Sequence, residues 1–244
     1  MITRRSSIAA IKRFLKRRGI IIDRYTCSTS PDLQLVRMLT VNGIDLVLDV
    51  GANTGGYAKA VREAGYRGRI LSFEPLSTAH AQLAGAAAAD RDWTVAPRMA
   101  LGDSDETLKI NIAGNSASSS ILSMTDGHTA AAPDSSYVGS EPVDVRRLDD
   151  VRHPFLDAAQ SPFLKIDTQG YETQVLAGAA RILPKIRGVQ LEMSLSRLYE
   201  GQTLWRDVIT VLEDSGFELW GLIPGFFNPT TGRMLQCDGV FFRS

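Results

Sequence analysis

Cysteine is scarce in this sequence of 244 residues, and long apolar runs are absent. The two cysteines, Cys27 and Cys237, lie far apart and form no CxxC pair, which excludes a disulfide framework and a cysteine-based zinc site. No apolar run approaches the roughly 20 residues that a membrane-spanning helix needs. The charged start is not followed by the apolar core of a signal peptide. We therefore expect reduced thiols and a cytoplasmic protein.

Two nucleotide-binding signatures are also missing from the glycine-rich turn at residues 51–56. The turn reads GANTGG, so it lacks the lysine of a phosphate-binding loop and the GxGxxG spacing of a dinucleotide fingerprint. Asp49, two residues before the first glycine, would repel a pyrophosphate. An NAD-dependent oxidoreductase is therefore the weaker alternative, and a binding module without catalysis is a further one.

What the sequence does contain is a regular alternation of strand-like and helix-like segments. Hydrophobic residues make up 44% and charged residues 22%, as in ordinary globular proteins. The pattern predicts strands at residues 44–50, 69–75, 93–101, 107–113, 162–168, 189–194, 217–223 and 237–244, and helices at residues 31–39, 54–65, 76–89, 171–183 and 204–216. Repeated strand–helix units with apolar strands indicate an α/β fold with a mostly parallel sheet and helices on both faces.

One long segment interrupts the alternation. Residues 115–142 are rich in Ser, Ala, Gly and Pro. A loop of this length inside a compact domain is usually functional or disordered. Two alternatives stay open for it, a lid over a substrate or cofactor and a merely mobile loop.

Basic residues are concentrated near the N-terminus, although the chain has no net charge. Residues 1–24 hold eight Lys or Arg and one acid. One helix face would carry the apolar residues Ile8, Ile11, Phe14 and Leu15. Two alternatives stay open for this helix. It packs on the domain, or residues 1–18 contact the anionic inner surface of the membrane. Nucleic acid is not expected as a partner, because basic and aromatic residues are not interleaved elsewhere. We divide the chain into a basic helical segment, residues 1–40, and a main domain, residues 41–244.

Acidic side chains lie at the ends of four predicted strands: Asp49, Glu74, Asp167 and Glu192. Ligands of open α/β sheets bind at the carboxyl ends of the strands, and buried carboxylates without partners are costly. The glycines of the first turn let the backbone approach a ligand closely. Glu74 can accept hydrogen bonds from ribose hydroxyls, and Asp49 favours a cationic ligand. S-adenosylmethionine therefore fits this nucleoside site better than a dinucleotide does.

The motifs along the main domain resemble those of the FkbM-type methyltransferases, a family of S-adenosylmethionine-dependent O-methyltransferases with a Rossmann-like fold and a seven-stranded sheet. The matching motifs are DVGANTG (49–55), SFEP (72–75), ALGD (100–103), VRRLDD (145–150), LKIDTQGYE (164–172) and LEM (191–193). The resemblance implies methylation of a hydroxyl, often on a sugar of a glycolipid, polysaccharide or glycosylated natural product. A non-sugar natural product is the alternative acceptor.

The resemblance also implies a set of cofactor contacts. Those at the methionine end and at the ribose are Asp49, Gly51, Asn53 and Glu74, and those beside the adenine are Ala100, Leu101 and Asp103.

Candidate catalytic residues lie where the later strands end. Asp167 could act as the general base for the acceptor hydroxyl, or Asp167 and Glu192 could together hold Mg²⁺, which would acidify that hydroxyl. His128, in the 115–142 segment, is a further candidate because it could swing over the site. Tyr199 and Phe226 are candidates for stacking on an acceptor sugar, although aromatic residues more often pack in the core.

Overall fold

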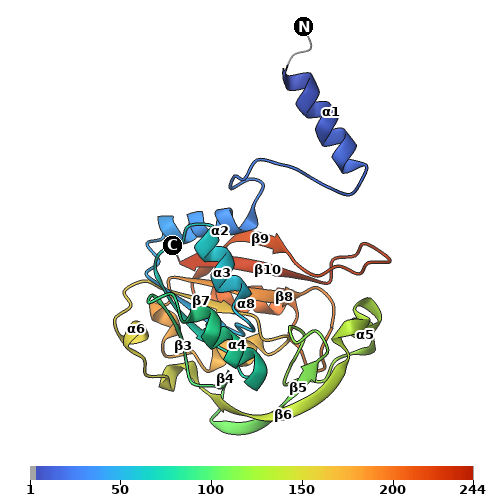
Figure 1. Cartoon of the computed structure of the whole chain (residues 1–244). Helices are drawn as coiled ribbons and strands as arrows, with labels where there is room; N and C mark the ends of the chain where they lie inside the picture. Colours follow the sequence, from blue (N-terminus) through green and yellow to red (C-terminus); the bar gives the residue numbers. More distant parts are fainter. Residues whose placement is uncertain (1–3, 244) are drawn as a thin grey trace.

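The computed structural model describes residues 4–243, with side chains from residue 11 onward, and its centre is a seven-stranded sheet (Figure 1). The order across the sheet is β3 (Trp93–Val95), β2 (Arg69–Phe73), β1 (Leu46–Val50), β7 (Pro162–Ile166), β8 (Gly188–Ser194), β10 (Gln236–Arg243) and β9 (Phe217–Pro224). Neighbours from β3 to β8 are parallel, and β10 is antiparallel to both β8 and β9. This arrangement confirms the predicted Rossmann-like α/β fold.

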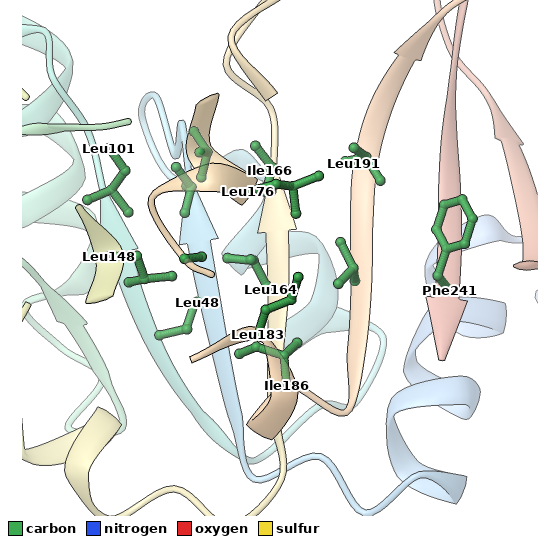
Figure 2. Close-up of a cluster of buried hydrophobic side chains, with 14 of the residues drawn as sticks. Leu48, Leu101, Leu148, Leu164, Ile166, Leu176, Leu183, Ile186, Leu191 and Phe241 are labelled. Atoms are coloured by element: carbon green, nitrogen blue, oxygen red, sulfur yellow. The ribbon is translucent and has the colours of Figure 1, made fainter. Parts of the chain in front are cut away.

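Helices cover both faces of the sheet because successive strand residues point to opposite sides. One face packs on α7 (Glu172–Ala177), α8 (Trp205–Asp214) and two 3₁₀ turns, η2 (Leu148–Asp150) and η3 (Leu183–Lys185). Figure 2 shows this core, in which Leu48, Leu164 and Leu191 from three neighbouring strands meet Leu176 and Leu183. The other face packs on α2 (Pro31–Val41), α3 (Gly56–Glu63) and α4 (Ser77–Ala87).

A second, three-stranded sheet has the order β4 (Ala100–Leu101), β6 (Tyr137–Arg146) and β5 (Glu106–Ala113). The single strand predicted over residues 93–101 is therefore two strands, β3 and β4, in different sheets. Pro97 lies between them, and proline cannot donate to a continuous strand ladder. The second sheet places β4 and β5 beside the carboxyl ends of the first strands, where they contribute to the site.

The 115–142 segment is more regular than the sequence indicates. It contains α5 (Asp126–Ala131), the 3₁₀ turn η1 (Pro133–Ser135) and the first residues of β6. The helix predicted over residues 171–183 is shorter than expected, since α7 ends at Ala177 and Gly178 then packs against the backbone directly after β4. A Cβ at Gly178 would lie 1.7 Å from the carbonyl oxygen of Gly102.

The N-terminal residues do not form one unit. α1 (Arg4–Lys16) stands away from the sheet (Figure 1), whereas α2 buries Leu35, Val36 and Leu39 in the core. The division at residue 40 thus separates α2 from the core that it helps to form. Among the described residues, no helix is both long and apolar enough to cross a membrane. A short α6 (Pro154–Asp157) completes the helices of the described chain.

Register brings polar residues together at one edge of the central sheet. Asp49 of β1, Lys165 of β7 and Gln190 of β8 are consecutive partners across three strands. Because β10 runs antiparallel, its first residues lie beside the last residues of β8, so Asp238 pairs with Glu192. The β9–β10 connection, residues 225–235, therefore also lies at the edge where the parallel strands end.

Candidate functional site

A cavity opens at the carboxyl ends of β1, β2 and β7. The space between its walls, with the open mouth included, is about 690 Å³. Its lining comes from the ends of these strands, from the second sheet and from the start of the 115–142 segment: Val50, Gly51, Asn53, Phe73, Glu74, Pro75, Leu76, Met99, Ala100, Leu101, Ile110, Ser116, Ala117, Ser119, Ser120, Ile121, Asp167, Thr168, Gln169 and Tyr171. Five of the seven residues expected to contact a cofactor therefore line one cavity.

The glycine turn lies directly against the end of β7. Gly51 has φ +74°, and a Cβ there would lie 1.8 Å from the carbonyl oxygen of Asp167. Asn53 has φ +47°, a left-handed conformation that asparagine tolerates better than most residues. Its backbone N–H donates to Oε2 of Glu74 over 2.7 Å. The turn thus connects the first two strand ends and leaves the cavity open beside them.

Glu74 is held by the backbone and keeps acceptor capacity. Its Oε2 accepts from Asn53 and its Oε1 accepts from the backbone N–H of Leu76 over 2.9 Å. Burial raises the pKa of Glu74 to about 7, against the two backbone hydrogen bonds that lower it. Each carboxylate oxygen has two lone-pair sites, so both still accept a ligand hydroxyl. This geometry suits the ribose role expected for Glu74.

Asp49 does not line the cavity, which corrects the contact expected for it. Its side chain is fully buried beneath α3, where Nζ of Lys165 lies 3.2 Å from Oδ1 and Oγ of Ser72 donates to Oδ2 over 3.1 Å. Asp49 is a residue within β1 and not after it, so the neighbouring strands and helix enclose it. Its charge is balanced by Lys165 and does not face a cationic ligand.

Lys165 links the two acidic strand ends. Its Nζ also donates to the carbonyl oxygen of Gly51 over 3.2 Å and lies 3.6 Å from Oδ2 of Asp167. Burial alone would favour the neutral amine, but Asp49 and Asp167 raise the pKa of Lys165 above its ordinary value. A permanent positive charge therefore lies beneath the glycine turn.

Part of the cavity lining is apolar. Ala100 and Leu101 of β4, which the family resemblance places beside the adenine, belong to this part together with Ile110, Ile121 and Tyr171. Asp103 is exposed and lies outside the lining, where Oγ of Ser104 donates to it over 3.4 Å. The expected hydrogen bond from the adenine amine to Asp103 is therefore not supported by its position.

The first part of the 115–142 segment covers the cavity. Oγ of Ser116 donates to Oδ1 of Asn53 over 3.3 Å, and Oγ of Ser120 donates to the carbonyl oxygen of Gln169 over 2.7 Å. Ser116 has φ +53°. Asn53, Ser116 and Gln169 are the non-glycine residues with positive φ in the described chain, and all three line this cavity. Backbone strain of this kind clusters at functional sites.

Asp167 and Glu192 lie close together, with an amide group between them. Nε2 of Gln169 donates to Oδ1 of Asp167 and to Oε2 of Glu192, over 2.9 Å in both cases. Oε2 of Glu192 also accepts from Nε2 of Gln236 over 2.6 Å. Burial, followed by the charge of Asp167, raises the pKa of Glu192 well above its ordinary value. The pair thus consists of a carboxylate that lines the cavity and a neighbour that favours its protonated form.

These side chains do not fit a bound Mg²⁺. Magnesium takes oxygen ligands, whereas the group between the two carboxylates is an N–H donor. Among residues 4–243 no group of three or more His, Cys, Asp or Glu side chains is arranged to hold a metal ion. The two carboxylates instead share hydrogen bonds from the amide groups of Gln169 and Gln236.

The three remaining candidates lie in a separate cluster under α5. His128 is buried and outside the cavity lining; its ring packs edge-on against Tyr199, with centroids 5.1 Å apart, and 5.6 Å from Phe226. Burial lowers the pKa of His128. Tyr199 is fully buried, so its ring has no face free for a sugar, and its O–H donates to Oε1 of Gln169 over 2.7 Å. Phe226 is partly buried against the same cluster. Their position corrects the stacking role expected for Tyr199 and places His128 away from the cavity.

Sequence reasoning missed Lys165, Gln169 and Tyr171. All three belong to the LKIDTQGYE motif, which was the signal available. Lys165 reads as a charge inside an apolar strand, and such a charge needs a buried partner. That partner is Asp49, one strand away.

Comparisons with known proteins indicate the family of the chain. The model of the Methyltransferase FkbM domain matches residues 49–219, more than half of the chain. The 2-O-methyltransferase NoeI of Sinorhizobium fredii is 27% identical over 192 residues, which cover 73% of this chain and 74% of that protein.

Two solved structures share part of the chain path. Magnesium protoporphyrin IX methyltransferase (ChlM) from Synechocystis PCC 6803 with bound S-adenosylmethionine is 11% identical, covers 97% of this chain and 96% of its own, and has a TM-score of 0.48. TehB from Haemophilus influenzae is 9% identical, covers 95% of this chain and 66% of its own, and has a TM-score of 0.48.

The family match, residues 49–219, includes every strand end that lines the cavity. The chain therefore belongs to the FkbM methyltransferase family and is an S-adenosylmethionine-dependent O-methyltransferase.

Proposed function

We propose that the chain methylates a hydroxyl of a sugar, with Asp167 as the general base. The observation that carries the proposal is the position of Asp167. It is the residue directly after β7, its side chain is 42% exposed, and it lines the cofactor cavity. By contrast, Asp49 is paired with Lys165, and Glu74 is held by two backbone amides. The similarity to a 2-O-methyltransferase and the resemblance to a family that often modifies sugars support a sugar acceptor.

The reaction needs an aligned acceptor oxygen and a group that takes its proton. S-adenosylmethionine supplies a methyl group on a sulfonium that leaves as a neutral thioether. Asp167 accepts the hydroxyl proton while the oxygen–carbon bond forms and the sulfur–carbon bond breaks. The products are a methyl ether, S-adenosylhomocysteine and a protonated Asp167, which returns its proton to water. Lys165 and Gln169 hold the two carboxylate oxygens in place, and no step needs a cation.

The proposal is tested with p-nitrophenyl glycosides of glucose, mannose, fucose and rhamnose, and with p-nitrobenzyl alcohol as a non-sugar acceptor. Formation of S-adenosylhomocysteine and the mass of the product are measured. We expect a methylated glycoside. Asp167→Asn should lower kcat by about 10²- to 10⁴-fold and leave the calorimetric affinity for S-adenosylmethionine within about twofold, since a carboxamide keeps the size of the side chain. Asp214→Asn, at an exposed position of α8 outside the cavity, is the matched control.

Two outcomes would contradict the proposal. Methylation of p-nitrobenzyl alcohol, with none of the glycosides, would favour a non-sugar natural product. Full turnover by Asp167→Asn would remove the general base.

The partner at the N-terminus is proposed to be an anionic lipid surface, which would also bring the enzyme to a glycolipid acceptor. α1 stands off the domain (Figure 1). The apolar side chains of Ile11, Phe14 and Ile21 are 57%, 56% and 76% exposed. Basic residues surround them at Arg13, Lys16, Arg17 and Arg18. An exposed apolar face beside a cationic one is typical of helices that lie in a membrane interface.

Vesicle flotation tests this contact. The full chain should bind vesicles of phosphatidylglycerol and phosphatidylcholine and should not bind phosphatidylcholine alone. Lys16→Glu with Arg17→Glu should lose binding, because each basic residue near the surface contributes about 1 kcal/mol. Arg91→Glu, whose side chain is 94% exposed outside this segment, is the matched control. Equal binding by all three proteins would leave α1 without a lipid role.

A further inference from the structure

Gln169 lies in a backbone conformation that costs free energy and is held there by neighbours. It has φ +55° and is followed by Gly170 with φ +100°, so two consecutive left-handed residues reverse the chain after β7. Oγ of Ser120 fixes the Gln169 carbonyl oxygen over 2.7 Å. At Gly170 a Cβ would lie 3.1 Å from side-chain atoms of Tyr199. The reversal directs the Gln169 side chain back between Asp167 and Glu192.

The orientation of the Gln169 amide follows from its partners. The O–H of Tyr199 donates to Oε1 of Gln169 over 2.7 Å and lies 3.2 Å from the carbonyl oxygen of Ser118. Burial raises the pKa of Tyr199, so the phenol stays protonated and remains a donor. The Gln169 carbonyl therefore faces Tyr199, and its two N–H bonds face the carboxylates, which only accept when ionised.

The amide acts on the two carboxylates differently. Asp167 is held at Oδ1 by Gln169, while Lys165 lies 3.6 Å from its Oδ2. The Oε2 atom of Glu192 accepts hydrogen bonds from the side-chain amides of both Gln169 and Gln236. The remaining charged groups that act on the pair are Lys165, Glu172 and Asp238. One amide thus fixes the rotation of Asp167 and separates it from Glu192.

We infer that Gln169, fixed by Tyr199, is a positioning residue that orients the carboxylate of Asp167 for proton removal. This inference rests on the role proposed for Asp167. It assigns to Tyr199 a function through its hydroxyl, from a position where its ring cannot touch an acceptor.

The test compares Gln169→Met, which keeps the length of the side chain without the amide, with Tyr199→Phe, which removes only the hydroxyl. Turnover is measured with the p-nitrophenyl glycoside that the wild-type enzyme methylates fastest. Gln169→Met should lower kcat on the order of 100-fold, with the KM for S-adenosylmethionine within about twofold. Tyr199→Phe should lower kcat by about tenfold, as for one lost hydrogen bond. Gln82→Met, on the exposed side of α4, is the control.

A second measurement does not depend on the acceptor. Crystal structures of the two variants should show the Asp167 carboxylate turned away from its wild-type rotamer. If Gln169→Met does not fold, Tyr199→Phe alone decides, because it preserves the buried ring.

The outcomes separate this inference from the proposed function. A folded variant of either kind that keeps both the wild-type kcat and the wild-type rotamer of Asp167 would overturn the positioning role, even if Asp167→Asn is inactive. Full turnover by Asp167→Asn would overturn the general base itself and the inference with it.

Discussion

Replacing Lys165 with methionine should destabilise the protein more than most single substitutions. The change would leave Asp49 fully buried with Ser72 as its one remaining hydrogen-bond donor, and Asp167 without its neighbouring cation. Removing one partner of a buried ion pair costs about 3–5 kcal/mol. With an unfolding entropy of about 2.1 cal/mol/K per residue, a chain of 244 residues should then lose roughly 6–10 °C in Tm.

Urea denaturation and thermal unfolding, followed by circular dichroism, measure this loss. Lys59→Met is the matched control, because Lys59 is exposed and its Nζ contacts only a backbone oxygen over 3.3 Å. The double variant Asp49→Asn with Lys165→Met should recover most of the stability, since no uncompensated charge is left in the core. A Tm for Lys165→Met within about 2 °C of the wild type would refute the reasoning. It would mean that Asp49 is not held by Lys165 and could face the cofactor.

Three further results are expected. Affinity for S-adenosylmethionine should rise with pH by up to about tenfold per unit below pH 7 and level off above it, because a ribose hydroxyl donates best to ionised Glu74, whose pKa is about 7. Calorimetry should show that Glu74→Gln loses this dependence on pH. An unchanged dependence in Glu74→Gln would place the ribose elsewhere. Gly51→Ala should lower the free energy of unfolding, measured by urea denaturation, by about 2–4 kcal/mol and abolish cofactor binding, since its Cβ would overlap the carbonyl oxygen of Asp167. Gly43→Ala, with φ +64° and no atom within 4 Å of its Cβ, should lower it by only about 1 kcal/mol. Equal losses in the two variants would show that steric overlap is not the cause. EDTA should leave turnover unchanged, and restoration of lost activity by added Mg²⁺ would reinstate a metal.

The fold could be predicted because apolar strands and amphipathic helices alternate along most of the chain. The same logic located the cavity, since parallel strands place their carboxyl ends at one edge. This reasoning did not show that Asp49 and Asp167 have different surroundings. Asp49 is the fourth residue of β1, whereas Asp167 follows the last residue of β7. Periodicity does not fix a strand end to one residue, yet that one residue decides between a buried ion pair and a cavity wall.

The amide between the carboxylates was also beyond the sequence. Its position depends on the left-handed backbone of Gln169 and on Tyr199, which is 30 residues away along the chain. Because Tyr199 follows the last predicted strand with an acidic end, the sequence suggested that its ring stacks on an acceptor sugar. The structure buries the ring, and the hydroxyl donates a hydrogen bond to Gln169. Reasoning from residue type predicts which groups gather at the edge of a sheet. It does not predict which of them face the ligand.

The antiparallel placement of β10 connects two distant parts of the chain. Every residue that lines the cavity precedes residue 172, whereas the β9–β10 connection, residues 225–235, reaches the same edge of the sheet from the opposite direction. Phe226 and Leu235 of that connection pack with Tyr199, whose hydroxyl holds Gln169 in the cavity wall. Insertions or deletions in residues 225–235 would therefore reach the cavity through Tyr199, although no residue of the connection lines it.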